Sequence, residues 1–183
     1  MLKTACSYAD GIRILNQEPW EALCSFIISQ NNNIPRIKGI IDKLCTMFGD
    51  EIDKNLFSFP TAEKVASLSV EELAPLKSGF RAKYILDAAR RVANGDVDLP
   101  SLRSLPLDEA RNELMKIYGV GNKVADCTLL FGLNRIDAFP KDVWIKRAME
   151  KLFNGSLPEC ASKYAGIAQQ YIFYYARSTK LDI

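Results

Sequence analysis

Apolar residues recur at helical spacing along most of this chain. Ile34, Ile37 and Ile41 mark one buried helical face, because positions three and four residues apart lie on the same side of an α-helix. Similar patterns predict helices over residues 20–30, 80–93, 107–116, 123–133, 143–153 and 161–176. No run of residues predicts a strand, and residues 96–102 are expected to form a loop. The expected fold class is therefore all-α.

The composition is that of a globular protein, with 183 residues, 48% apolar and 25% charged. A net charge of +2 does not indicate any class of partner. The chain has no histidine, and its five cysteines form no CxxC pair, so we expect no metal and no cofactor. No signal peptide or membrane-spanning run is predicted, which favours a reduced, cytosolic protein.

A glycine hairpin separates two helical patterns in the second half of the chain. Gly119, Val120 and Gly121 allow a tight reversal, and Asn122 is the predicted N-cap of the helix that follows. Backbone N–H groups at such a hairpin can hold a DNA phosphate at the positive end of the second helix. Lys123 falls in the first turn, which disfavours a charged amine and favours a nucleophilic one. A solvated surface lysine is the alternative.

A carboxylate follows this lysine at a distance that packing alone does not require. Asp142 comes after Phe139 and Pro140 and directly before a predicted helix. It can be the N-cap of that helix, or it can stabilise positive charge on a sugar as a base departs. The two roles are compatible, because a capping carboxylate is held in its ionised form.

Two helices carry residues suited to a flat heterocycle. Lys123, Cys127 and Phe131 recur at four-residue spacing on one helix, and Gln169 and Phe173 do so on the last. Aromatic rings stack on a base, while the glutamine amide offers a donor and an acceptor to its edge. Ordinary core packing of the rings and the thiol is the alternative.

Further residues suit a duplex from which a base has been extruded. Asn31 and Asn32 lie in a run of three asparagines, and Phe80 stands beside Arg81. Base flipping requires a wedge and hydrogen-bonding partners for the abandoned base, for which Arg36 and Arg81 are candidates. The alternatives are a helix end followed by a new N-cap, and a loop aromatic packed in the core.

The chain resembles the helix-hairpin-helix DNA glycosylase superfamily, and within it the eukaryotic-type 8-oxoguanine DNA glycosylase/AP lyases. Five blocks carry the likeness in order, and they span nearly the whole chain: FIISQNNNIPR (26–36), GFRAKY (79–84), YGVGNKVADC (118–127), FPKDV (139–143) and YAGIAQQYIF (164–173). The lysine within the third block is typical of the bifunctional enzymes.

The resemblance implies a role for each pocket residue. Lys123 would be the Schiff-base nucleophile and Asp142 its catalytic partner. Cys127 and Phe173 would sandwich the flipped base, and Gln169 would read its Watson–Crick edge. The implied activity is excision of 8-oxoguanine opposite cytosine, followed by β-elimination at the abasic site.

The resemblance also implies contacts with the duplex. Asn31 would enter the vacated space, Arg36 and Arg81 would contact the orphaned cytosine, and Phe80 would wedge the strands apart. Trp144 stands where a phosphate-contacting histidine is common in the family. The implied partner is double-stranded DNA with an oxidised purine, and the resemblance also implies a site for a monovalent cation at the hairpin. We expect a monomer, located in the cytoplasm with the nucleoid, or in the nucleus of a eukaryote.

The family fold has two helical lobes that flank a DNA-binding cleft. The helical bundle would span about residues 33–118, and residues 1–32 and 119–183 would form the second lobe. The family usually has an N-terminal antiparallel β domain that senses the N7 proton of 8-oxoguanine, and here the likeness begins almost at Met1. We therefore expect altered lesion discrimination or a fragment of a longer protein. The alternatives are the same chemistry on another oxidised or ring-opened purine, or a non-catalytic DNA-binding hairpin module.

Overall fold

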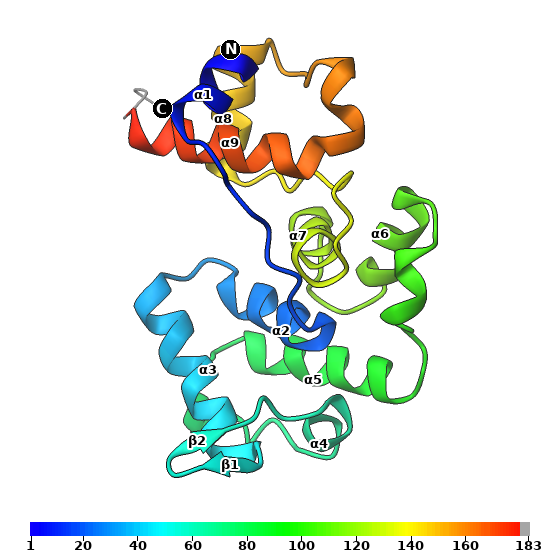
Figure 1. The fold of residues 1–183 in the computed structure, drawn as a ribbon. Helices are drawn as coiled ribbons and strands as arrows, with labels where there is room; N and C mark the ends of the chain where they lie inside the picture. Colours follow the sequence, from blue (N-terminus) through cyan, green and yellow to red (C-terminus); the bar gives the residue numbers. More distant parts are fainter. Residues whose placement is uncertain (180–183) are drawn as a thin grey trace.

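The computed structural model describes residues 1–179, which form two lobes of helices (Figure 1). The α-helices are α1 (Leu2–Tyr8), α2 (Pro19–Ser29), α3 (Ile34–Phe48), α4 (Ala62–Ala66), α5 (Arg81–Ala93), α6 (Leu107–Met115), α7 (Asn122–Gly132), α8 (Val143–Phe153) and α9 (Ala165–Ser178). The shorter elements are strands β1 (Glu51–Asp53) and β2 (Leu56–Phe57) and 3-10 helices η1 (Ala74–Leu76), η2 (Pro100–Arg103) and η3 (Glu159–Tyr164).

The larger lobe is built around α2 and α7, which pack against each other. Eight of the eleven residues of α7 are buried, so this helix lies inside the protein on most of its faces. Gly132 allows the close approach, because a Cβ there would lie 3.0 Å from the Cβ of Ala22 and 3.1 Å from the Cα of Pro19. Leu129 and Leu130 are fully buried, and each such side chain contributes about 1.5–3 kcal/mol.

The smaller lobe joins the beginning of the chain to its last described helix. Its core consists of Ile145, Ala148 and Met149 from α8 and Ile172 and Ala176 from α9. Helix α1 packs on α9, and Leu2 adds to this core. Residues 9–18 and 133–142 are the two segments that run between the lobes (Figure 1).

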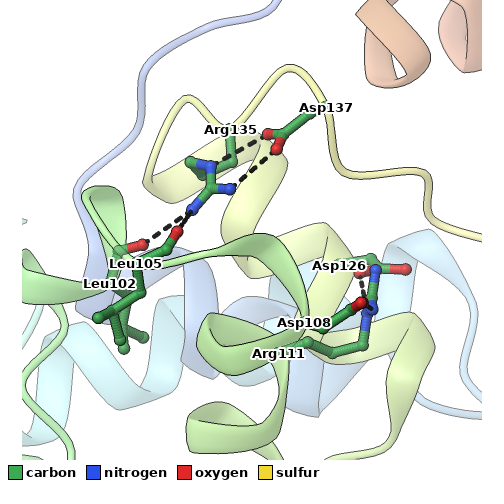
Figure 2. A network of polar contacts seen from close by, with 7 residues as sticks. All are labelled: Leu102, Leu105, Asp108, Arg111, Asp126, Arg135 and Asp137. Atoms are coloured by element: carbon green, nitrogen blue, oxygen red, sulfur yellow. Dashed lines mark hydrogen bonds and ion pairs between the residues drawn. The ribbon is translucent and has the colours of Figure 1, made fainter. Parts of the chain in front are cut away.

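An arginine fixes the second of these connections (Figure 2). Arg135 forms a two-pronged ion pair with Asp137, at 3.0 Å from Nε and 2.8 Å from Nη2. Its Nη1 donates to the carbonyls of Leu102, at 3.1 Å, and Leu105, at 2.7 Å. Because a planar guanidinium satisfies all four bonds in one geometry, the chain beyond α7 leaves in a defined direction.

The start of α9 is docked on the same connection. The Gly166 N–H donates to the carbonyl of Ile136 at 2.8 Å. A Cβ on Gly166 would lie 2.3 Å from Leu130 Cδ1 and 2.7 Å from the carbonyl oxygen of Ala138. Only glycine fits this contact, which holds α9 against the segment that leads to α8.

The all-α prediction is confirmed, with three local corrections in the described residues. A small antiparallel pair, β1 and β2, was not expected, and residues Pro100–Arg103 form 3-10 helix η2 where a loop was predicted. Gly121, rather than Asn122, is the N-cap of α7. The backbone of Gly121 is extended, as is usual for an N-cap, and helical geometry begins at Asn122.

The two hydrophobic cores contain other parts of the chain than the two lobes that the sequence predicted. We expected residues 1–32 and 119–183 to form one lobe. The larger core instead includes buried residues of α2, from Trp20 to Ile28, and of α7 and the segments on either side of it, from Val120 to Ala138. Helix α7 is buried on most of its faces and makes most of its contacts with α2 and α6 of the bundle, while it meets α9 only locally, at Leu130 and Gly166.

Candidate active site

The glycine hairpin is built against an aromatic ring. Gly119 has φ +82°, and a Cβ there would lie 2.4–2.5 Å from carbon atoms of the Tyr84 ring. Val120 is buried, and the Tyr118 N–H donates to Asp87 at 2.7 Å. These contacts fix the hairpin from behind, while the first N–H groups of α7 have no partner within the helix and can bind a phosphate.

A cavity of about 210 Å³ lies between the two lobes. It is lined by residues of α2, α7 and α9 and of the segment before α8: Phe26, Lys123, Cys127, Phe131, Pro140, Asp142, Gln169, Gln170 and Phe173. The structure thus brings together all six residues that the sequence predicted for the catalytic pair and the base pocket. Their catalytic and binding roles stay predictions.

Lys123 stands on the wall of this cavity among aromatic and sulfur groups. Its Nζ lies 5.3 Å from the centroid of the Phe26 ring, within the range of a cation–π contact. Phe26 in turn packs on Phe131, with ring centroids 5.4 Å apart. The lysine is half-buried and is directed by this aromatic floor, so it is not the freely solvated surface lysine of the alternative interpretation.

Cys127 lies one turn after the lysine and is almost fully buried. Burial raises the pKa of its thiol to about 11, and a hydrogen bond and the charge of Lys123 only partly oppose this effect. At neutral pH the residue is therefore a neutral thiol. It offers a polarisable surface to a ligand in the cavity and is a poor nucleophile.

Asp142 is the N-cap of α8, as one interpretation predicted. Its Oδ1 accepts the backbone N–H of Ile145 at 2.7 Å. The residue also lines the cavity, so capping and a role toward a ligand are compatible in this geometry. The carboxylate stands where the connection enters the smaller lobe, and it lines the same cavity as Lys123 of the larger lobe.

The buried end of α9 supplies the amide that the sequence predicted. Gln169 is 5% exposed, and its Nε2 donates to the carbonyl of Pro140 at 3.1 Å. Phe173 lines the cavity one turn further on, with the guanidinium carbon of Arg177 5.5 Å from its ring centroid. The contact to Pro140 ties the amide to the segment that carries Asp142.

Sequence reasoning missed three residues of the cavity wall, namely Phe26, Pro140 and Gln170. A single sequence shows neighbours along one helix, whereas Phe26 comes from an opposing helix and Pro140 from a loop. Gln170 directly follows Gln169, so the repeated glutamine was the available signal.

A second cavity, of about 480 Å³, lies beside the first, and Lys123 lines both. Its wall carries the ion pair of Arg111 with Asp126, with 2.8 Å from Nε to Oδ1 (Figure 2). Arg111 also pairs with Asp108. Burial raises the pKa of Asp126, and the hydrogen bond and charge of Arg111 oppose this shift. This network holds α6 against the first turns of α7.

Five of the residues predicted to contact the duplex lie near the end of α2 and the start of α5: Asn31, Asn32, Arg36, Phe80 and Arg81. Asn31 is exposed in the left-handed conformation, with φ +46°, and Phe80 is 51% exposed. The Arg36 guanidinium donates to the carbonyl of Lys77 at 3.0 Å. Asn32 caps α2 through a 3.0 Å bond from its Nδ2 to the carbonyl of Ile28.

Arg81, a predicted partner of the orphaned base, is buried in this structure. It is only 2% exposed, and its Nε donates to the carbonyl of Gln30 at 2.8 Å and its Nη2 to that of Asn31 at 2.8 Å. Its guanidinium carbon lies 4.4 Å from the centroid of the Phe80 ring. Burial, and then the nearby charge of Arg36, lower the pKa of Arg81. In this geometry Arg81 positions Asn31 and Phe80; its contact with an orphaned base stays a prediction.

The remaining features bear on partners. Trp144 is exposed in the first turn of α8, next to Asp142 and facing away from the core. Within residues 1–179, no group of His, Cys, Asp or Glu side chains could hold a metal ion. No helix in the same range is long and apolar enough to cross a membrane.

Comparisons with known proteins agree with this architecture. Residues 24–162 match the model of the HhH-GPD superfamily of base excision DNA repair proteins. The N-glycosylase/DNA lyase of Saccharomyces cerevisiae is 41% identical over 174 residues, covering 84% of this chain and 46% of the yeast protein. The chain therefore spans under half the length of that relative.

Two solved structures are similar over 98% of the chain. One is MBOgg1 in complex with a low affinity DNA ligand, with TM-score 0.89, 44% identity and 66% of that chain covered. The other is Clostridium acetobutylicum 8-oxoguanine glycosylase/lyase with double-stranded DNA containing cytosine opposite 8-oxoguanine, with TM-score 0.87, 38% identity and 67% of that chain covered.

Proposed function

This chain belongs to the HhH-GPD superfamily of base excision DNA repair proteins, and from that premise we propose that it is a DNA glycosylase/AP lyase. Its substrate would be 8-oxoguanine opposite cytosine in duplex DNA. One observation carries the proposal: Lys123 shares a cavity of about 210 Å³ with a carboxylate, a thiol, an amide and aromatic rings. A module that only grips phosphates needs the hairpin but none of these groups.

The first step is displacement of the base. The amine nitrogen of Lys123 forms a bond to C1′ of the extruded nucleotide, while the C1′–N9 bond breaks and its electron pair leaves with the base. The amine gives up one proton to solvent, and the departing base takes up one proton from solvent. Asp142, which caps α8 through the N–H of Ile145, faces the sugar with its carboxyl group and stabilises the positive charge that builds there.

The second step cuts the strand. Opening of the sugar ring converts the C1′ adduct into an imine with Lys123, and loss of a C2′ proton then expels the 3′-phosphate. The hairpin N–H groups hold a neighbouring phosphate and so keep C1′ near the amine. The proposed partner is duplex DNA, and a cation at the hairpin and a monomeric state stay predictions.

Borohydride trapping tests the lysine. Reduction of the imine should link the wild-type protein covalently to a duplex containing 8-oxoguanine. Lys123→Gln should abolish trapping and leave duplex binding within a few-fold, because the amide keeps most of the length of the side chain without a nucleophile. Lys64→Gln, an exposed residue of α4, is the matched control and should trap normally. Undiminished trapping by Lys123→Gln would refute the assignment.

Cleavage of a lesion panel tests the substrate. Duplexes should carry 8-oxoguanine, guanine or a ring-opened purine opposite each of the four bases. Preferential cutting of 8-oxoguanine opposite cytosine supports the proposal. Preference for a ring-opened purine would keep the chemistry and change the lesion.

A further inference from the structure

Gln170 is a second amide on the wall of the base cavity. It follows Gln169 on α9, is half-buried and lines the same space as Lys123 and Phe173. Neither step of the proposed reaction uses it. Its position is well defined, because Gly166, one turn earlier, locks α9 against the connection between the lobes.

A backbone carbonyl sets the orientation of both amides. The oxygen of Pro140 can only accept, so the end of Gln169 that meets it must be Nε2. The other end of Gln169 is then Oε1, which accepts from Nε2 of Gln170 at 2.5 Å. Gln170 must therefore present its own Oε1 on its remaining side.

The bonds to Pro140 and Gln170 leave the Gln169 amide with few hydrogen-bonding groups for a ligand. A glutamine amide has two N–H donors and two acceptor lone pairs. Pro140 takes one donor and Gln170 takes one lone pair, so one of each remains. The Watson–Crick edge of a guanine-type base presents one acceptor, O6, and two donors, N1–H and the N2 amino group. Gln169 can therefore bind O6 and one of the two donors, and a second acceptor is needed for the other donor.

We propose that Gln170 is a specificity-determining residue, which supplies the second acceptor for a guanine-type edge and holds Gln169 in the matching orientation. The inference rests on the proposed function and deepens it. Among the other polar groups of the cavity, Lys123 and Asp142 act at the sugar, and the neutral Cys127 thiol is a weak acceptor. The free oxygen of Gln170 is the acceptor that remains.

The test compares two lesions that differ only at the edge in question. 8-Oxoguanine and 8-oxoadenine share the oxidised ring, but adenine presents one donor and one acceptor where guanine presents two donors and one acceptor. Gln170→Met keeps the length of the side chain and removes both hydrogen-bonding groups. Gln17→Met, at an exposed position in the first connection, is the matched control.

We expect Gln170→Met to lower the preference for 8-oxoguanine over 8-oxoadenine about tenfold in kcat/KM, since one hydrogen bond is lost. Trapping on a preformed abasic site, which contains no base to read, should be unchanged. Gln17→Met should match the wild type in both assays. A preference that stays within twofold of wild type in Gln170→Met would overturn the inference.

A binding measurement separates this inference from the proposed function. Duplexes with 2′-fluoro nucleotides of the two lesions resist cleavage, so their Kd ratio reports base recognition without chemistry. A Kd ratio that falls about tenfold in Gln170→Met supports the role of Gln170 even if the wild type excises neither base. An unchanged Kd ratio overturns it. Failure of the wild type to excise or trap would overturn the proposed function alone.

Discussion

Replacing Gly119 with alanine should destabilise the protein through two separable effects. The residue has φ +82°, which costs a non-glycine residue about 1–2 kcal/mol. The new Cβ would also lie 2.4–2.5 Å from three carbon atoms of the Tyr84 ring. That ring packs edge-on between Phe80 and Tyr118, with centroids 5.5 and 5.0 Å away, so it cannot move aside freely. Overpacking of this kind adds about 1–3 kcal/mol.

The expected loss in the free energy of unfolding is therefore about 2–5 kcal/mol. Two other glycines isolate the contributions. Gly95 has φ +77°, and no atom lies within 4 Å of the place that a Cβ would take, so Gly95→Ala should cost only the backbone part, about 1–2 kcal/mol. Gly121 has φ −107° and open space around it, so Gly121→Ala should be neutral or stabilising by up to about 1 kcal/mol.

Urea unfolding followed by circular dichroism measures all three variants. Tyr84→Ala combined with Gly119→Ala should recover part of the loss, because it removes the ring that the new Cβ meets. If Gly119→Ala costs no more than Gly95→Ala, the ring does not restrict the hairpin and the reasoning is wrong. Gly121→Ala should weaken DNA binding without loss of stability, since its Cβ stands where a phosphate would approach.

The ionisable groups give two further predictions. The hydrogen bond from Arg135 lowers the pKa of Asp137, so this carboxylate stabilises the fold above its ordinary pKa, and the contribution is lost as pH falls through its lower, folded-state pKa. Asp137→Asn should thus lower the urea midpoint at pH 7 and match the wild type near pH 2; a constant difference would contradict this. Cys127 should resist iodoacetamide at pH 7.5, because it is 4% exposed and its pKa is about 11. Exposed Cys160 should react under the same conditions. Peptide mass spectrometry measures both, and equal labelling of the two cysteines would contradict the prediction.

The helical pattern predicted the parts of the site that lie along single helices. Lys123, Cys127 and Phe131 share one stripe of α7 and line one cavity, as their four-residue spacing indicated. Asp142 caps α8 as predicted, because capping depends on residues only three positions apart. These features are local, so a sequence without aligned relatives contains them.

The unpredicted features depend on residues far apart in the chain. The sequence indicated Arg81 as a partner for an abandoned base, but not its bonds to the carbonyls of Gln30 and Asn31, which lie 51 and 50 positions away. Arg135 likewise meets the carbonyls of Leu102 and Leu105, 33 and 30 positions earlier. Every residue has a backbone carbonyl, so neither residue type nor periodicity indicates which carbonyls accept hydrogen bonds from an arginine.

The pairing of α1 with α9 has a consequence for synthesis on the ribosome. Helix α1 emerges before any residue of the larger lobe, and its partner emerges after all of them. Residues 19–138 can bury their core while the nascent chain still grows, but α1 must wait unpaired until α9 leaves the exit tunnel. Because Gln169 and Phe173 lie on α9, the cavity that Lys123 lines is completed last, and a chain stalled before α9 should fold its hairpin but lack this cavity.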